Sequence, residues 1–199
     1  LIRPAYWPAL ARGVAPGVEH GAALAGHEFA SVIDVGANKG QFAAFARHSW
    51  PQARLICFEP LPGPRATLSA VTDGRAEVHP VALGEAEGEA VMHLASRADS
   101  SSLLPLGEAQ KRLFDMDEAG RLTVPVRRLD AVIDAADLPR PALLKIDVQG
   151  FEYETLKGAD GLLGKIDAVY VEASFVELYA GQKLFADVAA LLVVAGFTE

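Results

Sequence analysis

Residues suited to holding a nucleotide-like cofactor come early in the chain, where the apolar run Val32–Val35 carries Asp34 and leads into a glycine-containing turn. Gly36 permits a tight bend and close ligand approach, and Gly40 permits a following helix to pack against the strand. The first N–H groups of that helix would face an anionic or polar ligand. The spacing D-x-G-x-x-x-G matches neither the dinucleotide fingerprint nor the phosphate loop. The pattern predicts a nucleotide-like ligand, with a strand-turn-helix corner that binds nothing as the alternative.

The ends of the next two predicted strands carry further candidates for the same ligand. In an open parallel sheet, ligands collect outside the carboxyl ends of the strands. Glu59 lies 25 residues after Asp34, near the offset of about 20 residues at which an acid accepts hydrogen bonds from ribose hydroxyls. We therefore expect Glu59 to bind ribose, with an exposed charge beside a proline-rich loop as the alternative. Ala82 and Leu83 at the end of the third strand are expected to lie under an adenine ring.

The fourth predicted strand carries charges where apolar residues are expected. Leu143–Val148 should be apolar throughout if both faces of its sheet are covered, yet it contains Lys145 and Asp147. Charges inside such a run are costly unless they are paired or used. Alternation along the strand would direct Lys145, Asp147 and Gln149 to one side. Asp147, near the carboxyl end, is best placed to meet the ligand.

The fifth predicted strand also ends in an acid, because Glu172 follows Val169–Val171. If the two strands are neighbours about 4.8 Å apart, Asp147 and Glu172 form a carboxylate pair. Paired acids drive their pKa values apart, which suits one of them to general-base catalysis near neutral pH. The alternative is a salt-bridge network with Lys145 that only ties strands together.

Weaker candidates surround these acids. Glu152 begins a helix, where its charge complements the helix macrodipole. Tyr179 is expected either to contact an acceptor or to be an ordinary amphipathic tyrosine at a loop edge. Asp99 and the serines at 100–102 are expected to hydrogen-bond a ligand or to form a solvated loop.

The order of predicted elements indicates the fold that positions these residues. Strands are expected near 31–36, 54–59, 76–82, 141–148 and 168–173, and helices near 40–48, 62–71, 151–163 and 184–195. This rhythm predicts an α/β fold with a Rossmann-like, doubly wound, mainly parallel sheet. We expect one domain over residues 1–199, with one or two short helices in an N-terminal extension at 1–28.

An insert interrupts this rhythm at residues 84–140, after the third strand. It contains two β-like runs, Glu89–Ala95 and Arg121–Arg127, on either side of the amphipathic segment Leu106–Glu118. An insert of this kind predicts a lid-like segment.

Composition narrows the function classes. A net charge of −8 over 199 residues argues against a nucleic-acid partner, although a local basic patch near Arg127 and Arg128 stays open. The single cysteine, Cys57, lies in an apolar run and is expected to be a core thiol. One cysteine and five scattered histidines together predict no metal site. No apolar segment reaches the roughly 18 to 20 residues of a membrane helix, and we expect a cytoplasmic protein. Because the chain begins at Leu1, we expect residues to be missing upstream.

Together these motifs resemble class I S-adenosylmethionine-dependent methyltransferases, and among them the FkbM family of O-methyltransferases. The resemblance covers about residues 31–196 and rests on Val32–Gly40, Phe58–Pro60, Val126–Asp130 and Leu144–Glu152. It implies a class I methyltransferase fold with S-adenosylmethionine as methyl donor. The implied acceptor is a hydroxyl of a sugar, a glycan or a polyketide-type natural product. The class normally ends in a β-hairpin after the last helix, and this sequence stops at Glu199 before one. We expect either that the final strands are missing from this sequence or that the sheet is shortened.

The resemblance also implies roles for residues at matching positions. It assigns the methionine end of the cofactor to Asp34, Gly36, Ala37, Asn38 and Gly40, the ribose to Glu59, and membership of the strand-four motif to Asp147, Gln149 and Glu152. We expect Asp147 to contact the cofactor as well, and Asp147 or Glu172 to act as the base. The alternatives are an RNA methyltransferase, a non-catalytic binding module of the same fold, and a dehydrogenase, which the glycine spacing opposes. The oligomeric state stays open, with a homodimer as one option.

Overall fold

The computed structural model describes residues 6–198, which divide into two compact units. The first contains the described chain up to Pro80 together with Asp137–Lys145 and Lys165–Val169, and the second contains Val81–Ala136, Ile146–Gly164 and the described chain from Tyr170 onward. Two strands, β7 (Ala142–Ile146) and β8 (Ala168–Val171), begin in the first unit and end in the second. The expectation of one domain over residues 1–199 stays a prediction.

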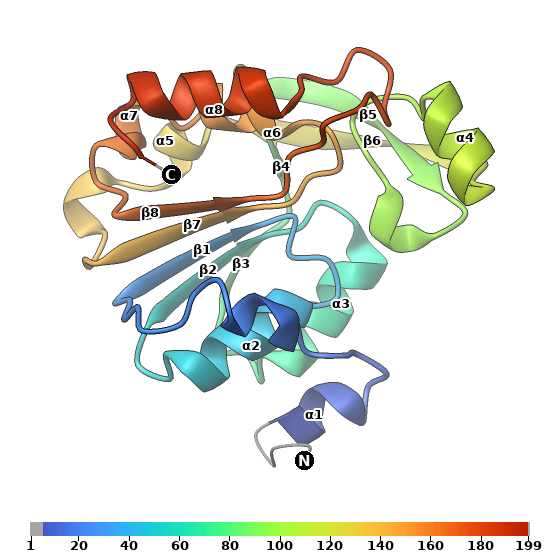
Figure 1. Cartoon of the computed structure of the whole chain (residues 1–199). Helices are drawn as coiled ribbons and strands as arrows, with labels where there is room; N and C mark the ends of the chain where they lie inside the picture. Colours follow the sequence, from blue (N-terminus) through green and yellow to red (C-terminus); the bar gives the residue numbers. More distant parts are fainter. Residues whose placement is uncertain (1–5, 199) are drawn as a thin grey trace. The chain divides into compact units, whose positions relative to one another are not determined.

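A five-stranded parallel sheet in the order β3-β2-β1-β7-β8 provides the framework (Figure 1). The remaining strands are β1 (Ser31–Val35), β2 (Arg54–Phe58) and β3 (Glu77–His79). In the β1/β2 pair, Asp34 lies opposite Cys57. Every residue of β1 and β7 is buried, as the nearly continuous apolar runs of a parallel sheet predict. The expected α/β fold with a mainly parallel sheet is confirmed.

The helices of the first unit follow the sequence pattern closely. They are α1 (Trp7–Leu10), the 3-10 helix η2 (Val18–Gly21), α2 (Gln41–Ser49) and α3 (Pro62–Val71). A proline can begin α3 because the first helical residue needs no N–H partner. The short N-terminal helices and the helices expected near 40–48 and 62–71 are confirmed; residues 1–5 of the extension lie outside the described residues.

The second unit contains a small mixed sheet in the order β4-β6-β5 (Figure 1). Its strands are β4 (Ala82–Leu83), β5 (Gly88–Ala95) and β6 (Glu118–Arg127); β5 and β6 are antiparallel, and β4 pairs with β6 in parallel. The two β-like runs of the insert are therefore confirmed. The helices of this part of the chain are η3 (Ala98–Ser100), α4 (Glu108–Phe114), α5 (Leu129–Val132), η4 (Ala135–Asp137), α6 (Glu152–Lys157), α7 (Asp160–Leu163) and α8 (Phe185–Val194).

Two expectations about element boundaries are wrong. The third strand ends at His79 because Pro80 has no N–H to continue a ladder, and Ala82–Leu83 pairs with β6 instead. The helix expected over 151–163 is divided into α6 and α7. The division falls at Gly158, where a Cβ atom would lie 2.0 Å from the Gly84 carbonyl oxygen, so two backbones meet there.

Candidate cofactor and catalytic residues

The turn after β1 depends on left-handed backbone conformations, with φ of 77° at Gly36, 47° at Asn38 and 93° at Gly40. The N–H groups of Gly36 and Ala37 donate to the Phe58 carbonyl at 3.1 and 3.0 Å, and Gly40 N–H donates to the Ala37 carbonyl at 2.8 Å. These amides are satisfied within the protein. A ligand at this turn would therefore meet the first N–H groups of α2 and the Asn38 side chain.

Glu59 is held against this turn by two backbone amides. Its Oε2 accepts a hydrogen bond from Asn38 N–H at 2.9 Å, and its Oε1 accepts one from Leu61 N–H at 2.7 Å. The side chain is buried, and burial raises the pKa of its carboxyl group. Each carboxylate oxygen keeps a further acceptor site. The structure thus brings Glu59 beside the turn after β1, and its contact with ribose stays a prediction.

Asp34 and Lys145 form a buried ion pair between neighbouring strands of the large sheet. Lys145 Nζ lies 3.1 Å from Asp34 Oδ1, and it stands 5.5 Å from the ring centroid of Phe42 in α2. Asp34 is fully buried and Lys145 is 5% exposed. The charge that interrupts the apolar fourth strand therefore pairs with Asp34 of β1.

Cys57, opposite Asp34, is also buried, which raises the pKa of its thiol well above the usual value and confirms a core thiol.

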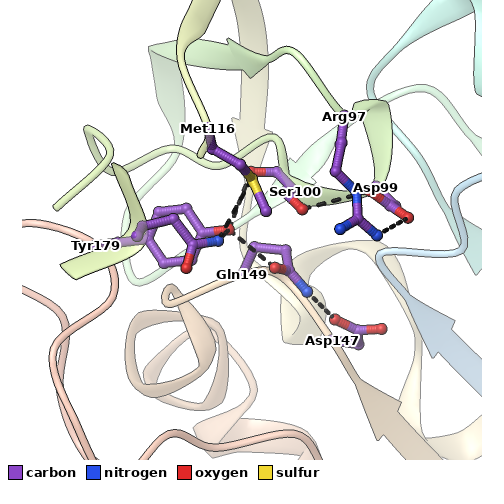
Figure 2. Close-up of polar contacts among 8 residues, drawn as sticks. Arg97, Asp99, Ser100, Met116, Asp147, Gln149 and Tyr179 are labelled. Carbon is purple, nitrogen blue, oxygen red and sulfur yellow. Dashed lines mark hydrogen bonds and ion pairs between the residues drawn. The ribbon is translucent and has the colours of Figure 1, made fainter. Parts of the chain in front are cut away.

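The loop after β7 holds the strand-four residues in the second unit. β7 ends at Ile146 and Gln149 adopts a φ of 57°, so strand alternation does not govern the direction of Gln149, contrary to expectation. Gln149 Nε2 donates to Asp147 Oδ1 at 2.7 Å (Figure 2). The loop thus joins two of the three motif residues directly.

Glu152 lies in the first turn of α6, and its side chain hydrogen-bonds the backbone of the same loop. Its Oε1 accepts hydrogen bonds from Val148 N–H at 3.3 Å and Gly150 N–H at 3.0 Å. The side chain is 2% exposed, and its Oε2 is buried without a hydrogen-bond partner among residues 6–198. Burial raises the pKa of Glu152 to about 7. Glu152 is therefore a loop-holding carboxyl group as well as a residue of the first helical turn.

Glu172 follows β8 and lies beside the end of β7, because its N–H donates to the Ile146 carbonyl at 3.0 Å. The sheet order confirms that the fourth and fifth strands are neighbours. A carboxylate pair between Asp147 and Glu172 stays a prediction.

Ala82 and Leu83 are both buried in β4 of the second unit, and the Leu83 carbonyl accepts a hydrogen bond from Thr155 Oγ1 at 3.2 Å. Their place under adenine stays a prediction too.

The structure corrects the view of Tyr179 as a residue at a loop edge, since only 2% of it is exposed. Its hydroxyl donates to Gln149 and Ser100 (Figure 2). It also accepts a hydrogen bond from Gln110. Sequence reasoning missed this cluster because its members are up to 79 residues apart. The only local signal is the turn after Tyr179, where Gln182 Oε1 accepts the Tyr179 N–H at 3.2 Å.

The remaining charged candidates are paired on the surface. Arg127 donates to Glu87 at 3.0 Å, and Arg128 donates through Nε to Asp130 at 2.9 Å, so neither presents an unneutralised basic patch. In residues 6–198 there is no group of three or more His, Cys, Asp or Glu side chains that could hold a metal ion. None of the helices in this range has the length and hydropathy needed to cross a membrane. The cytoplasmic location stays a prediction.

The fold that carries these loops is that of a methyltransferase domain. The chain belongs to the methyltransferase FkbM domain family, whose model matches residues 34–198. It is 33% identical over 167 residues to the 2-O-methyltransferase NoeI of Sinorhizobium fredii, covering 76% of this chain and 66% of that protein. It is 28% identical over 140 residues to the hexuronic acid methyltransferase AglP of Haloferax volcanii, covering 70% of this chain and 54% of that protein. The chain thus spans about two thirds or less of these relatives.

A solved structure supports the same fold. The crystal structure of an FkbM methyltransferase from Methylobacillus flagellatus superimposes with a TM-score of 0.53 at 22% identity, over 83% of this chain and 40% of that one. At this level of identity the likeness establishes the fold.

Proposed function

We propose that this protein is an S-adenosylmethionine-dependent O-methyltransferase that methylates a hydroxyl group of a sugar or a related natural product. The observation that carries the proposal is the match of residues 34–198 to the FkbM methyltransferase family, which begins at the candidate cofactor motif. Two relatives refine it: NoeI is a 2-O-methyltransferase, and AglP acts on a hexuronic acid. A hydroxyl on a sugar or sugar acid is therefore the acceptor class to test first.

The residues present in the first unit fit an S-adenosylmethionine molecule. Asn38 Oδ1 is buried without a hydrogen-bond partner among residues 6–198, which is an acceptor suited to an ammonium group such as that of methionine. Glu59 offers further acceptor sites to a pair of ribose hydroxyls. Neither the contact with the ammonium group nor the contact with the ribose requires the glycine spacing of a dinucleotide site. Asn38 would thus hold the methionine portion of the cofactor, and Glu59 would hold its ribose.

When bound, S-adenosylmethionine would supply an electrophilic methyl group on its sulfonium. The acceptor oxygen would take this methyl group as the C–S bond breaks, with the electron pair of that bond staying on sulfur. Asp147 or Glu172 would take the proton from the acceptor hydroxyl. Positioning of the reactants can contribute about 7 to 11 kcal/mol, and general-base catalysis a further 10²- to 10⁴-fold. The neighbouring positions of β7 and β8, the strands that these acids follow, support this proposal.

The test is methyl transfer from radiolabelled S-adenosylmethionine to a panel of hydroxylated sugars, uronic acids and RNA. We expect label to enter at least one sugar or uronic acid and none to enter RNA. Labelled RNA, or cofactor binding without transfer to any acceptor, would contradict the proposal.

Two variants separate binding from chemistry. Glu59→Ala is expected to weaken S-adenosylhomocysteine binding by about 10- to 100-fold, because one or two hydrogen bonds to a charged group are lost. Glu172→Gln should keep that affinity and slow transfer by about 10²-fold or more if Glu172 is the base. Unchanged affinity in Glu59→Ala would refute the ribose assignment.

A further inference from the structure

The Tyr179 hydroxyl lies at the centre of a buried hydrogen-bond cluster within the second unit (Figure 2). Its oxygen is 2.9 Å from Gln149 Oε1 and 3.0 Å from the Ser100 carbonyl oxygen, both acceptors for its single proton. It also accepts a hydrogen bond from Gln110 Nε2 at 3.3 Å. Burial raises the pKa of Tyr179, so the hydroxyl keeps its proton and remains a donor at physiological pH.

The Gln149 side-chain amide connects this hydroxyl to Asp147. Its Oε1 accepts from Tyr179, and its Nε2 donates to Asp147 Oδ1 at 2.7 Å. An amide has one accepting end and one donating end, so a flipped Gln149 would place its oxygen against a carboxylate oxygen. Contact with the Tyr179 hydroxyl therefore favours the amide orientation that donates to Asp147.

The backbone around Gln149 is held as firmly as its side chain. Gln149 has a φ of 57°, a conformation that costs a residue with a side chain about 1 to 3 kcal/mol and persists where the surroundings enforce it. Ser102 Oγ donates to the Gln149 carbonyl at 2.7 Å. The Tyr179 ring also packs on Gly150, where an added Cβ would lie 2.9 Å from Tyr179 Cδ2. Strain held in this way is typical of loops that carry a functional side chain.

The insert takes part in the same cluster. Leu106 and Tyr179 form an isolated β-bridge, Gly107 N–H donates to the Leu178 carbonyl at 2.9 Å, and Ala180 N–H donates to the Pro105 carbonyl at 2.9 Å. The segment carrying Tyr179 is thus fixed to the insert by main-chain hydrogen bonds. This fixes the position of the hydroxyl relative to Gln149.

We propose that Tyr179 is a positioning residue for methyl transfer, which acts through Gln149 to hold the Asp147 carboxylate in one orientation toward the acceptor hydroxyl. The inference rests on the proposed function, because it takes Asp147 to lie beside the reacting atoms. Tyr179 itself touches neither substrate nor cofactor in this account.

The first test measures the link between the two side chains without turnover. Hydrogen exchange of the Gln149 side-chain amide is followed by NMR in the wild-type protein, in Tyr179→Phe and in Tyr153→Phe, a control that removes a hydroxyl with no hydrogen bond to this cluster. Loss of one buried hydrogen bond should speed exchange by about 5- to 10-fold in Tyr179→Phe. The control should match the wild type. Equal exchange rates in all three proteins would overturn the inference.

The second test measures catalysis. Tyr179→Phe should lower kcat by about 10-fold while the dissociation constant of S-adenosylhomocysteine stays within about 2-fold, because only the orientation of the acid changes. Combining it with Gln149→Ala should slow transfer no further than Gln149→Ala alone, since the residues act in series. Multiplicative effects, or an unchanged kcat in Tyr179→Phe, would overturn the inference. A wild-type protein that methylates no acceptor would contradict the proposed function itself, whereas unchanged amide exchange would overturn only the role of Tyr179.

Discussion

Replacing Glu152 with glutamine should change how stability depends on pH. Burial raises the pKa of Glu152 from 4.5 to about 7, so the folded protein holds this proton over a pH range in which the unfolded chain has lost it. The stability that this carboxyl group contributes is complete below pH 4.5 and is lost as the pH rises to about 7. At about 1.36 kcal/mol per pKa unit, the loss is about 3 kcal/mol.

Glutamine keeps an oxygen that can accept the Val148 and Gly150 N–H bonds but carries no charge. Glu152→Gln should therefore match the wild-type free energy of unfolding near pH 4 and exceed it by up to about 3 kcal/mol at pH 8. Urea unfolding at intervals between these pH values measures the difference in free energy of unfolding between the variant and the wild type. Contributions from other titrating groups are the same in both proteins and cancel in this difference.

Glu177→Gln is the matched control, because Glu177 is exposed and its Oε1 also accepts a backbone bond, from Gly181 N–H at 2.8 Å. No buried carboxyl group is removed there, so the difference from wild type should stay constant between pH 4 and pH 8. If Glu152→Gln showed the same constant difference, the pKa of Glu152 would not be raised in the folded protein, and the reasoning would fail.

Two further substitutions test the framework of the fold. Lys145→Met removes the ammonium 3.1 Å from the fully buried Asp34 carboxylate and should lower the free energy of unfolding by about 3 to 5 kcal/mol, as measured by urea unfolding. Adding Asp34→Asn should recover part of this loss. A loss below about 1 kcal/mol in Lys145→Met would argue against a buried ion pair. Gly158→Ala places a Cβ 2.0 Å from the Gly84 carbonyl oxygen and should lower the melting temperature sharply, at a cost of about 3 kcal/mol or more, whereas Gly164→Ala meets nothing within 4 Å and should be close to neutral. Equal melting temperatures for the two alanine variants would show that the backbones at residues 84 and 158 do not meet.

Local patterns predicted the elements whose signals lie within one segment. The apolar run ending at Val35, the glycine turn and the helix beginning at Gln41 were readable because strand, turn and helix each have their own residue preferences. The apolar residues beyond Pro80 predict a longer third strand than the structure has, although Pro80 itself marks the end. The break at Gly158 has no local signal, because the backbone that meets it comes from the distant residue 84.

The candidate site divides in the same way. The positions of Asp34 and Glu59 near strand ends predict cofactor contacts, which stay predictions. The structure brings Glu59 against the turn after β1 and pairs the buried Asp34 with Lys145. The partner of Lys145 could not, because pairing across β1 and β7 depends on strand order. Tyr179 shows the limit most clearly, since its contacts join residues 30 and 79 positions apart and leave no periodic trace in the sequence.

The measurement that bears most directly on the central claim, a methyl-donor site formed by the turn after β1 and Glu59, is calorimetric titration of the purified protein with S-adenosylhomocysteine and, in parallel, with NAD. We predict micromolar binding of S-adenosylhomocysteine that weakens in Glu59→Ala, and no binding of NAD. Binding of NAD, or no binding of S-adenosylhomocysteine by a folded sample, would contradict the account.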